Sequence, residues 1–161
     1  MPSFKLRVDG LSTGAVANTF LTALAVKFAN TTGHRARLRS LAIGGTGGAP
    51  QDIQVSARLR RTGNTSDGTS TAVATTYVTK ADPNSIASNV TAIGKNYTVE
   101  PTTYEPGSLG LGSFNARNTI IKEWALDQAP VWGPNQTLGL EVAPGSATAT
   151  TLEVTLEWEE F

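Results

Sequence analysis

The chain has 161 residues, a formal net charge of zero and no cysteine, with 39% hydrophobic and 16% charged residues. Disulfide bonds and thiolate metal sites are therefore excluded, and the hydrophobic content is typical of a folded domain. A chain of this length buries about 70% of its unfolded surface in one core. The most apolar stretch, Phe20–Ala29, is too short to span a bilayer and contains Lys27. We therefore expect a soluble protein without an export signal.

The charges are divided unevenly between the two halves of the chain. Residues 1–80 carry ten Lys or Arg and three Asp or Glu, whereas residues 81–161 carry three and ten, giving net charges of +7 and −7. In sheets that mix early and late strands, this division favours cross-strand ion pairs within one subunit. A dipolar subunit that docks head to tail with copies of itself is the alternative.

In the first half of the chain, strands are predicted where apolar and polar residues alternate. The first candidate is Phe4–Val8. The second, Thr19–Phe28, could instead be a helix because its leucines also fit a helical spacing. Two strands that carry rows of arginines follow, at 35–43 and 53–61, and Ala72–Thr79 is the next candidate.

The second half begins with a predicted short helix at Pro83–Ile93, where Asp82 can cap the first turn. Further strands are predicted at Tyr97–Glu100, Thr119–Leu126 and Leu138–Val142. The clearest strand is the closing TLEVTLEWEEF (151–161), in which one face is apolar and the other is mostly glutamate.

Turn residues such as Asp-Gly and Gly-Pro-Asn separate almost all of these segments. Eight or nine short strands with turns between them predict an all-β fold: a single-domain antiparallel β-sandwich, jelly-roll-like, with one short helix and long loops. Residues 1–14 are interpreted as an N-terminal arm that leaves the body, and residues 15–161 as the sandwich domain. The segment Thr98–Asn118 is rich in Pro and Gly and is predicted to be a loop that meets a partner.

The glycine-rich stretch LAIGGTGGAPQDIQV (41–55) raises the question of phosphate binding. A Walker loop needs a lysine after its last glycine, and none is present here. A dinucleotide fingerprint needs glycine where this chain has Pro50, and it needs a helix to follow, whereas a strand pattern follows here. The stretch is therefore predicted to be a flexible connection between two strands.

No group of residues in the sequence predicts catalysis or a cofactor. His34 is the only histidine, and no serine lies in a GxSxG motif. Glu153 and Glu157 lie four apart on a predicted strand and are separated by roughly 13 Å, too far to share a proton or a metal ion. The arginine rows could contact nucleic-acid phosphates, but few aromatic residues accompany them, so nucleic-acid binding is disfavoured.

Taken together, several segments resemble the small β-sandwich proteins that decorate or cement the heads of tailed bacteriophages. The segments are GGTGGAPQDIQVSARLRRTG, TKADPNS, DQAPVWGPNQTLGLEVAPG and TLEVTLEWEEF. The resemblance implies a non-enzymatic virion structural protein, made in the host cytoplasm and bound to the capsid surface. It also implies self-association, with a trimer favoured, binding to the major capsid protein, and no membrane contact.

The expected interface lies on the N-terminal arm, the two arginine-bearing strands and the long loop. Its twelve residues are Phe4, Leu6, Arg7, Arg35, Arg37, Arg39, Arg58, Arg60, Tyr104, Leu109, Leu111 and Phe114.

Two other functions remain open from the sequence. A carbohydrate-binding or host-recognition module would expose coplanar tryptophans for sugar stacking, whereas the capsid hypothesis predicts that Trp124 and Trp158 are buried. An enzyme would need a pocket in which two carboxylates converge from separate strands. The candidates for such a pair are Asp52, Asp67, Asp82, Glu123 and Asp127.

Overall fold

The computed structural model describes residues 1–29, 33–46, 52–62 and 68–161. These residues form two antiparallel sheets that pack against each other, which confirms the predicted all-β sandwich. The one helical element in the described part of the chain is a single 3-10 turn, η1 (Thr75–Tyr77).

Sheet A has the strand order β10-β3-β12-β1-β6, and β9 also pairs with β3. Both β9 and β10 lie along the same edge of β3, at opposite ends of that strand. The strands of sheet A are β1 (Ser3–Ser12), β3 (Ala36–Gly45), β6 (Thr79–Lys80), β9 (Ile120–Glu123), β10 (Val131–Trp132) and β12 (Thr151–Glu160).

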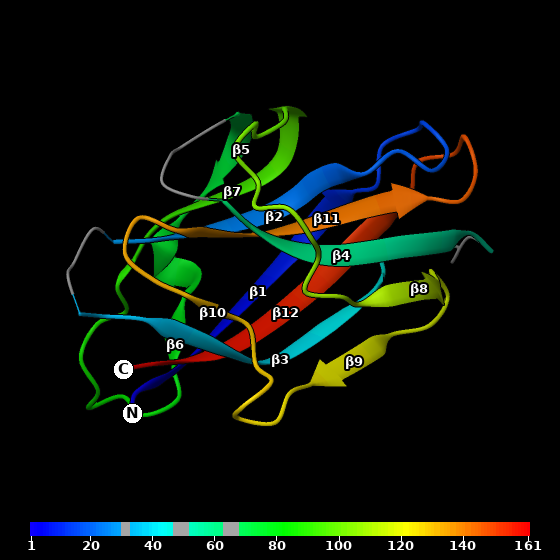
Figure 1. The fold of residues 1–161 in the computed structure, drawn as a ribbon. Helices are drawn as coiled ribbons and strands as arrows, with labels where there is room; N and C mark the ends of the chain where they lie inside the picture. Colours follow the sequence, from blue (N-terminus) through cyan, green and yellow to red (C-terminus); the bar gives the residue numbers. More distant parts are fainter. Residues whose placement is uncertain (30–32, 47–51, 63–67) are drawn as a thin grey trace.

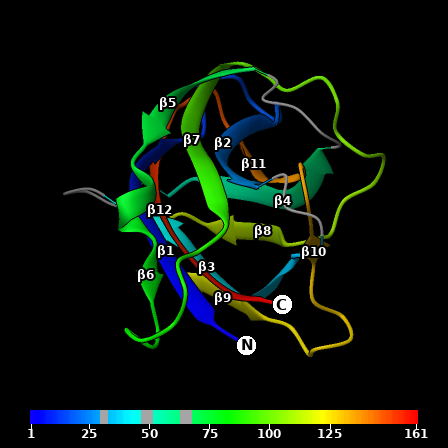
Figure 2. The same ribbon diagram turned by 90° about the vertical axis from the view of Figure 1, so that its left-hand side faces the viewer.

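Sheet B has the strand order β5-β7-β2-β11-β4-β8 and covers the inner face of sheet A (Figure 2). Its strands are β2 (Leu21–Phe28), β4 (Gln54–Thr62), β5 (Thr69–Val73), β7 (Val90–Val99), β8 (Gly112–Asn115) and β11 (Thr137–Pro144). The sequence of Thr19–Phe28 fitted either a strand or a helix. In the structure, most of this segment forms the strand β2.

Eight of the strands follow a jelly-roll order. In sheet A these are β1-β12-β3-β9, and in sheet B they are β2-β11-β4-β8. Successive members of the set alternate between the sheets, except for β4 and β8, which are neighbours in sheet B, as in two interlocked Greek keys. The strands β5 and β7 widen sheet B beside β2, and the short β6 and β10 extend sheet A (Figure 1).

The core lies between the sheets and is centred on aromatic side chains. Phe4 stacks on Trp158 with ring centroids 5.9 Å apart, and Trp132 lies 6.3 Å from Trp158. Phe28 meets the edge of Trp132, also at 6.3 Å. Such aromatic pairs add to the stabilisation that comes from burying their area. One residue from each of β1, β2, β10 and β12 thus meets in the centre.

The expectation of an N-terminal arm is wrong. Residues 3–12 form β1, which pairs along almost its whole length with β12 and also with β6. Phe4 and Leu6 point inward and are buried, so neither can contact a partner as predicted. The two ends of the chain lie side by side, because the Glu160 amide donates to the Pro2 carbonyl at 3.0 Å (Figure 1).

The helix expected at Pro83–Ile93 is also absent from the structure, which describes all of that segment. Asp82 does cap a turn, because its side chain accepts the Asn84 amide at 2.9 Å. The chain then continues extended to Val90, where β7 begins. Buried Glu160 accepts hydrogen bonds from Ser88 and Asn89, which fasten this segment to β12.

The glycine-rich stretch connects β3 in sheet A to β4 in sheet B, as predicted. Gly44 and Gly45 still belong to β3, and residues 47–51 lie outside the described part of the chain. The neighbouring segment at residues 116–119 crowds both glycines. The Gly45 amide donates to the Ala116 carbonyl at 3.0 Å, and a Cβ on Gly44 would meet Thr119. These two glycines therefore allow close approach of another part of the backbone.

Candidate functional site

The outer face of sheet B carries the largest group of buried polar side chains in the described structure. Three residues there lie directly opposite one another across neighbouring strands: Gly139 in β11, Ala25 in β2 and Gly94 in β7. These small residues leave room above the sheet. Tyr104 lies over Gly139, whereas Ser70 and Tyr97 lie over Gly94.

Residues 100–111, which we call the covering segment, lie along β4 and across this face. The Glu105 amide donates to the Arg61 carbonyl at 2.8 Å, and the Leu109 amide donates to the Leu59 carbonyl at 2.9 Å. Tyr104 forms an isolated bridge with Thr62. The segment is therefore hydrogen-bonded to the body of the domain, although its composition predicted a loop directed at a partner.

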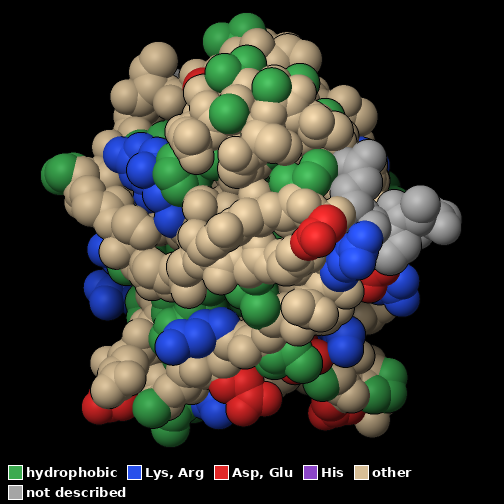
Figure 3. Space-filling view, turned by 90° about the vertical axis from the view of Figure 1, so that its right-hand side faces the viewer, with side chains coloured by type: hydrophobic (Ala, Val, Ile, Leu, Met, Phe, Trp, Pro, Cys, Tyr) green, Lys and Arg blue, Asp and Glu red, His purple; other side chains and the backbone are tan. Residues whose placement is uncertain are grey.

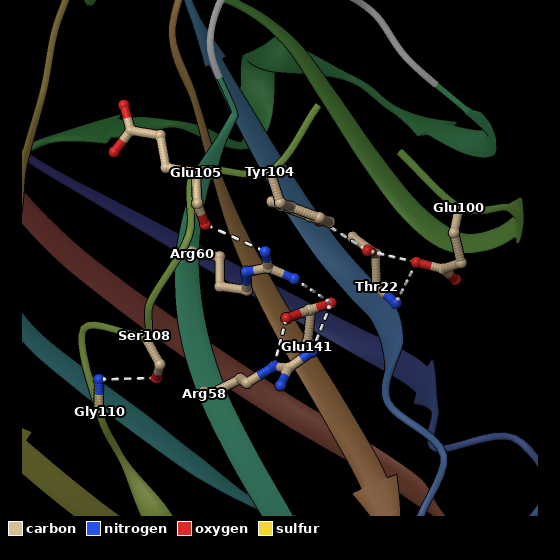
Figure 4. A network of polar contacts seen from close by, with 9 residues as sticks. All are labelled: Thr22, Arg58, Arg60, Glu100, Tyr104, Glu105, Ser108, Gly110 and Glu141. Carbon is tan, nitrogen blue, oxygen red and sulfur yellow. Dashed lines mark hydrogen bonds and ion pairs between the residues drawn. The ribbon is translucent and has the colours of Figure 1, made fainter. Parts of the chain in front are cut away.

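Glu141 is the central charge beneath the covering segment. Its side chain is only 5% exposed, and its carboxylate accepts Arg58 Nε at 2.5 Å and lies 3.8 Å from Arg60 Nη1 (Figure 4). Aromatic rings cover both guanidinium groups: Phe20 lies 3.9 Å from Arg58, and Tyr104 lies 4.7 Å from Arg60. A buried carboxylate is stable only with such partners, since an unpaired one would carry its full desolvation cost.

A second part of the network joins Tyr104 to Glu100 through Thr22. The Glu100 carboxylate accepts the Thr22 amide at 2.9 Å and the Thr22 hydroxyl at 2.6 Å. Thr22 has one hydroxyl proton and gives it to Glu100, so the Tyr104 hydroxyl, 2.6 Å away, must donate to Thr22 Oγ1. Burial, and to a smaller extent the nearby carboxylates, raise the pKa of Tyr104 well above its usual range. Tyr104 is therefore a neutral donor at physiological pH.

This network fastens one segment to the sheet through Glu141 and through Glu100 Oε2, whereas the buried Glu100 Oε1 has no hydrogen-bond partner within the described structure. The carboxylates of Glu100 and Glu141 both accept hydrogen bonds from the protein, and neither lines any of the four cavities described in the structure. The same four cavities contain none of Asp52, Asp82, Glu123 and Asp127, the described members of the predicted carboxylate pair. Asp67 lies outside the described residues.

The two arginine rows do not form one surface. Arg37 and Arg39 lie on sheet A, whereas Arg58 and Arg60 lie on sheet B beneath the covering segment. Arg39 pairs with Glu159 at 3.4 Å, and Arg37 lies 4.8 Å from the Phe161 ring. Arg35 precedes β3 and is exposed.

Lys and Arg side chains from residues 1–80 pair with glutamates from residues 81–161 on both sheets of the described structure. This confirms the interpretation of the uneven charge as pairing within one subunit. On sheet A, Lys5 contacts Glu157 at 2.9 Å and Arg7 contacts Glu153 at 2.7 Å. On sheet B, Arg61 contacts Glu105 at 3.0 Å. Of the predicted interface residues, Arg7 is exposed but already paired.

The apolar residues predicted for the interface belong to the sandwich instead. Phe114 is buried, and Leu109 and Leu111 are half-buried and pack against the core. Tyr104 is half-buried in the network above. The sequence suggested contacts with a partner because it does not show which distant segments of the same chain pack against these side chains.

The tryptophans do not form an exposed platform. Trp132 and Trp158 are 1% exposed and Trp124 is 9% exposed. The arrangement that the carbohydrate-binding hypothesis requires is therefore not present, and the burial of Trp124 and Trp158 is as the capsid hypothesis predicts.

Comparison with known proteins gives no assignment, because neither a family model nor a curated protein matches the chain. Among the described residues, no group of three His, Asp or Glu side chains is placed to hold a metal ion. The same part of the chain contains no helix long and apolar enough to cross a membrane.

Exposed apolar side chains identify a surface that the sequence did not predict. In β9 and the turn after it, Ile121 is 69% exposed and Leu126 is 55% exposed. Ile121 lies opposite Ala42, on the edge strand of sheet A. Within the described residues, β9 pairs only with β3, so its other edge has no strand beside it (Figure 1). We call the residues 120–126 the β9 edge.

Proposed function

We propose that this protein is a non-enzymatic structural component of a bacteriophage virion, which self-associates and binds the outside of the capsid lattice. It is made in the host cytoplasm and acts on the capsid surface. Support comes from the jelly-roll sandwich and from a buried polar network that fastens the covering segment to sheet B.

The observation that carries the proposal is the β9 edge. A strand with one free edge and exposed apolar side chains favours pairing with another chain, and proteins usually protect such edges. Ile121 is the most exposed large hydrophobic residue of the folded strands. We therefore assign the subunit contact to the β9 edge, in place of the arm and the arginine rows.

The rest of the visible surface fits contact with a large protein lattice. Figure 3 shows one end of the sandwich, where neutral side chains and backbone dominate and single charges of both signs are scattered among apolar groups. A surface of this kind has no strong field of one sign, which nucleic-acid binding would need.

The test of self-association is the molar mass in solution, measured by light scattering after gel filtration. The wild-type protein is expected to be a trimer, and Ile121→Glu is expected to be a monomer because it places a charge in the contact. Val99→Glu is the matched control, since Val99 is 57% exposed on β7 of sheet B. A monomeric wild type, or a trimer that survives Ile121→Glu, would contradict the proposed contact.

Capsid binding is tested separately by co-sedimentation with empty heads assembled from a major capsid protein of a tailed bacteriophage. The wild-type protein is expected to sediment with the heads at a fixed ratio to capsid subunits. Absence from the pellet at every ratio tested would overturn the capsid part of the proposal, whatever the oligomeric state.

A further inference from the structure

A cavity of about 180 Å³ lies on the outer face of sheet B, next to the covering segment. Its floor is a row of four residues that face one another across the strands: Thr62 in β4, Thr137 in β11, Lys27 in β2 and Ala92 in β7. Directly opposite residues of antiparallel strands have Cβ atoms about 5 Å apart, so these side chains converge on one space.

Lys27 is the only charged residue that lines this cavity. It is half-buried and forms no ion pair with the described part of the chain. The exposed Arg35 and Lys122 also form no ion pair with the described residues. Arg37 and Lys95 are half-buried without one, but Arg37 lies over the Phe161 ring and Lys95 donates to the Asp9 carbonyl. A partly desolvated ammonium without a counter-ion is unfavourable, so an anion at this position would be stabilised.

Hydroxyl groups accompany the lysine. Thr62 is 2% exposed, and its Oγ1 atom has no hydrogen-bond partner within the protein. A buried polar atom without a partner is rare in native proteins and calls for an explanation. Rotation about χ1 moves the hydroxyl from one staggered position to another, so Thr62 can turn its donor toward the cavity that it lines. Thr137 lies beside it in the floor.

The remaining walls are largely apolar. Ala92 belongs to the floor, and Tyr97 and Pro101 close the sides. Gly94 is essential for this shape, since a Cβ at that position would lie 2.9 Å from the Tyr97 hydroxyl. A cavity of about 150 Å³ with apolar walls can hold a molecule of the size of benzene. The walls therefore suit the apolar part of a small organic molecule.

We propose that this cavity binds a small organic molecule through an oxyanion group, with Lys27 as the charge partner and Thr62 as a second hydrogen-bond donor. The carboxylate is the simplest such group, and a phosphate or sulfate ester shares its chemistry. The ligand's apolar part lies against Tyr97 and Pro101. This site does not depend on the structural role proposed above, and its test uses the isolated protein.

The test compares benzoate with benzamide, which has the same ring and nearly the same shape but no charge. Binding is followed in ¹H–¹⁵N correlation spectra of the labelled full chain. Benzoate is expected to shift the amide signals of Lys27, Gly94 and Thr137 in a saturable manner. Benzamide is expected to bind at least about tenfold more weakly, because it loses the charge-assisted hydrogen bond. Equal affinity for the two probes would overturn the proposal.

Variants identify the residues responsible. Lys27→Met keeps a long, flexible side chain but removes its charge. It is expected to weaken benzoate binding about tenfold without changing the binding of benzamide. Lys27→Gln is a second variant in case the first does not fold. The matched control is Lys122→Met on β9, which also removes an unpaired lysine. Benzoate affinity that survives both Lys27 variants, or falls equally in the control, would contradict the assignment.

Two further measurements separate the parts of the site. Thr62→Val has the same shape without the hydroxyl, and it is expected to weaken benzoate binding several-fold while leaving the free protein at least as stable. Unchanged affinity would remove Thr62 from the site. Inorganic phosphate is expected to bind more weakly than benzoate because it makes no contact with the apolar walls. Equal binding of phosphate would contradict the organic part of the proposal.

Discussion

Tyr104 lies directly over Gly139, and a Cβ on that glycine would stand 2.6 Å from the tyrosine hydroxyl and 3.0 Å from its ring. This contact lets Tyr104 and the covering segment lie over β11, which is buried at every position. The tyrosine and the glycine are 35 positions apart in the sequence, in segments of different character.

Gly139→Ala is expected to lower the free energy of unfolding by about 1–3 kcal/mol, since it forces Tyr104 off the sheet. Urea denaturation measures the change. The matched control is Gly133→Ala, where the nearest atom to a Cβ is at 3.5 Å and ordinary contact results. Adding Tyr104→Phe to Gly139→Ala removes the nearest atom and should recover part of the loss. A destabilisation as large in the control would show that the effect is not due to Tyr104.

Glu141→Ala is expected to cost about 2–4 kcal/mol, because it leaves Arg58 and Arg60 partly buried without a counter-ion. The value is below that of a fully buried pair, since the Arg58 side chain is 33% exposed. Glu153→Ala removes a half-buried partner of Arg7, whose own side chain is 62% exposed, and is expected to cost less than about 1 kcal/mol. Similar costs for both variants, measured by urea denaturation, would show that burial of Glu141 adds nothing.

Asn96 has a φ of 51° and connects the two sheets. Its side chain accepts the Ser12 amide at 2.8 Å and donates to the Gly10 carbonyl at 2.9 Å, at the irregular point of β1. Asn96→Ala loses both hydrogen bonds and replaces asparagine, which tolerates the left-handed region, with alanine, which does not, at a cost of about 2–3 kcal/mol. Asn96→Gly loses the hydrogen bonds alone and should cost less. A larger loss for glycine in thermal or urea unfolding would contradict this account.

The Lys5–Glu157 pair predicts a pH dependence of stability. The hydrogen bond and charge of Lys5 lower the pKa of Glu157 below its usual value of 4.5, against a smaller opposing effect of burial. The folded state therefore binds this proton less readily than the unfolded state. The stabilisation is present above about pH 4.5 and is lost as pH falls through the lower, folded pKa. In Lys5→Met, the pKa of Glu157 followed by NMR titration should rise toward its usual value, and no rise would refute the assignment.

Alternation in the sequence was enough to find the strands that are buried on one face only. β12 and β4 alternate between core and solvent along their length, and the arginine and glutamate rows that stand on the outer faces predicted the ion pairs. The sandwich class followed from these strands and the turns between them.

The strands under the covering segment were harder to interpret for a physical reason. β11 is buried at every position from Thr137 to Pro144, because the core covers one face and the covering segment and its neighbours cover the other. β2 is buried at most positions, and for this reason its sequence also fitted a helix. A strand with two buried faces loses the alternation on which the prediction depends.

The N-terminal arm was mispredicted, and Phe4, Leu6 and Phe114 were wrongly expected at the surface, because the segments that pack against them are distant in the chain. Phe4 lies opposite Trp158, so nothing near the N-terminus indicates that β1 is a central strand. Tyr104 and Leu109 lie in a segment rich in proline and glycine, which resembles an exposed loop. The space that Tyr104 occupies is made by Gly139, which is distant in the sequence. The exposure of Ile121 could not be predicted either, because Ile120 and Ile121 are adjacent and the sequence does not show which of them faces the core.

The order of the strands also determines when the domain can form during synthesis. The central strand of sheet A is β12, between β1 and β3, and β11 lies between β2 and β4 in sheet B. Both come from residues 137–160. Until the ribosome has released this last part, neither sheet has a middle strand, and the earlier strands present unpaired edges. Folding of the nascent chain must therefore wait until residues 137–160 have left the ribosome, and before that point the unpaired edges of the earlier strands are exposed to aggregation.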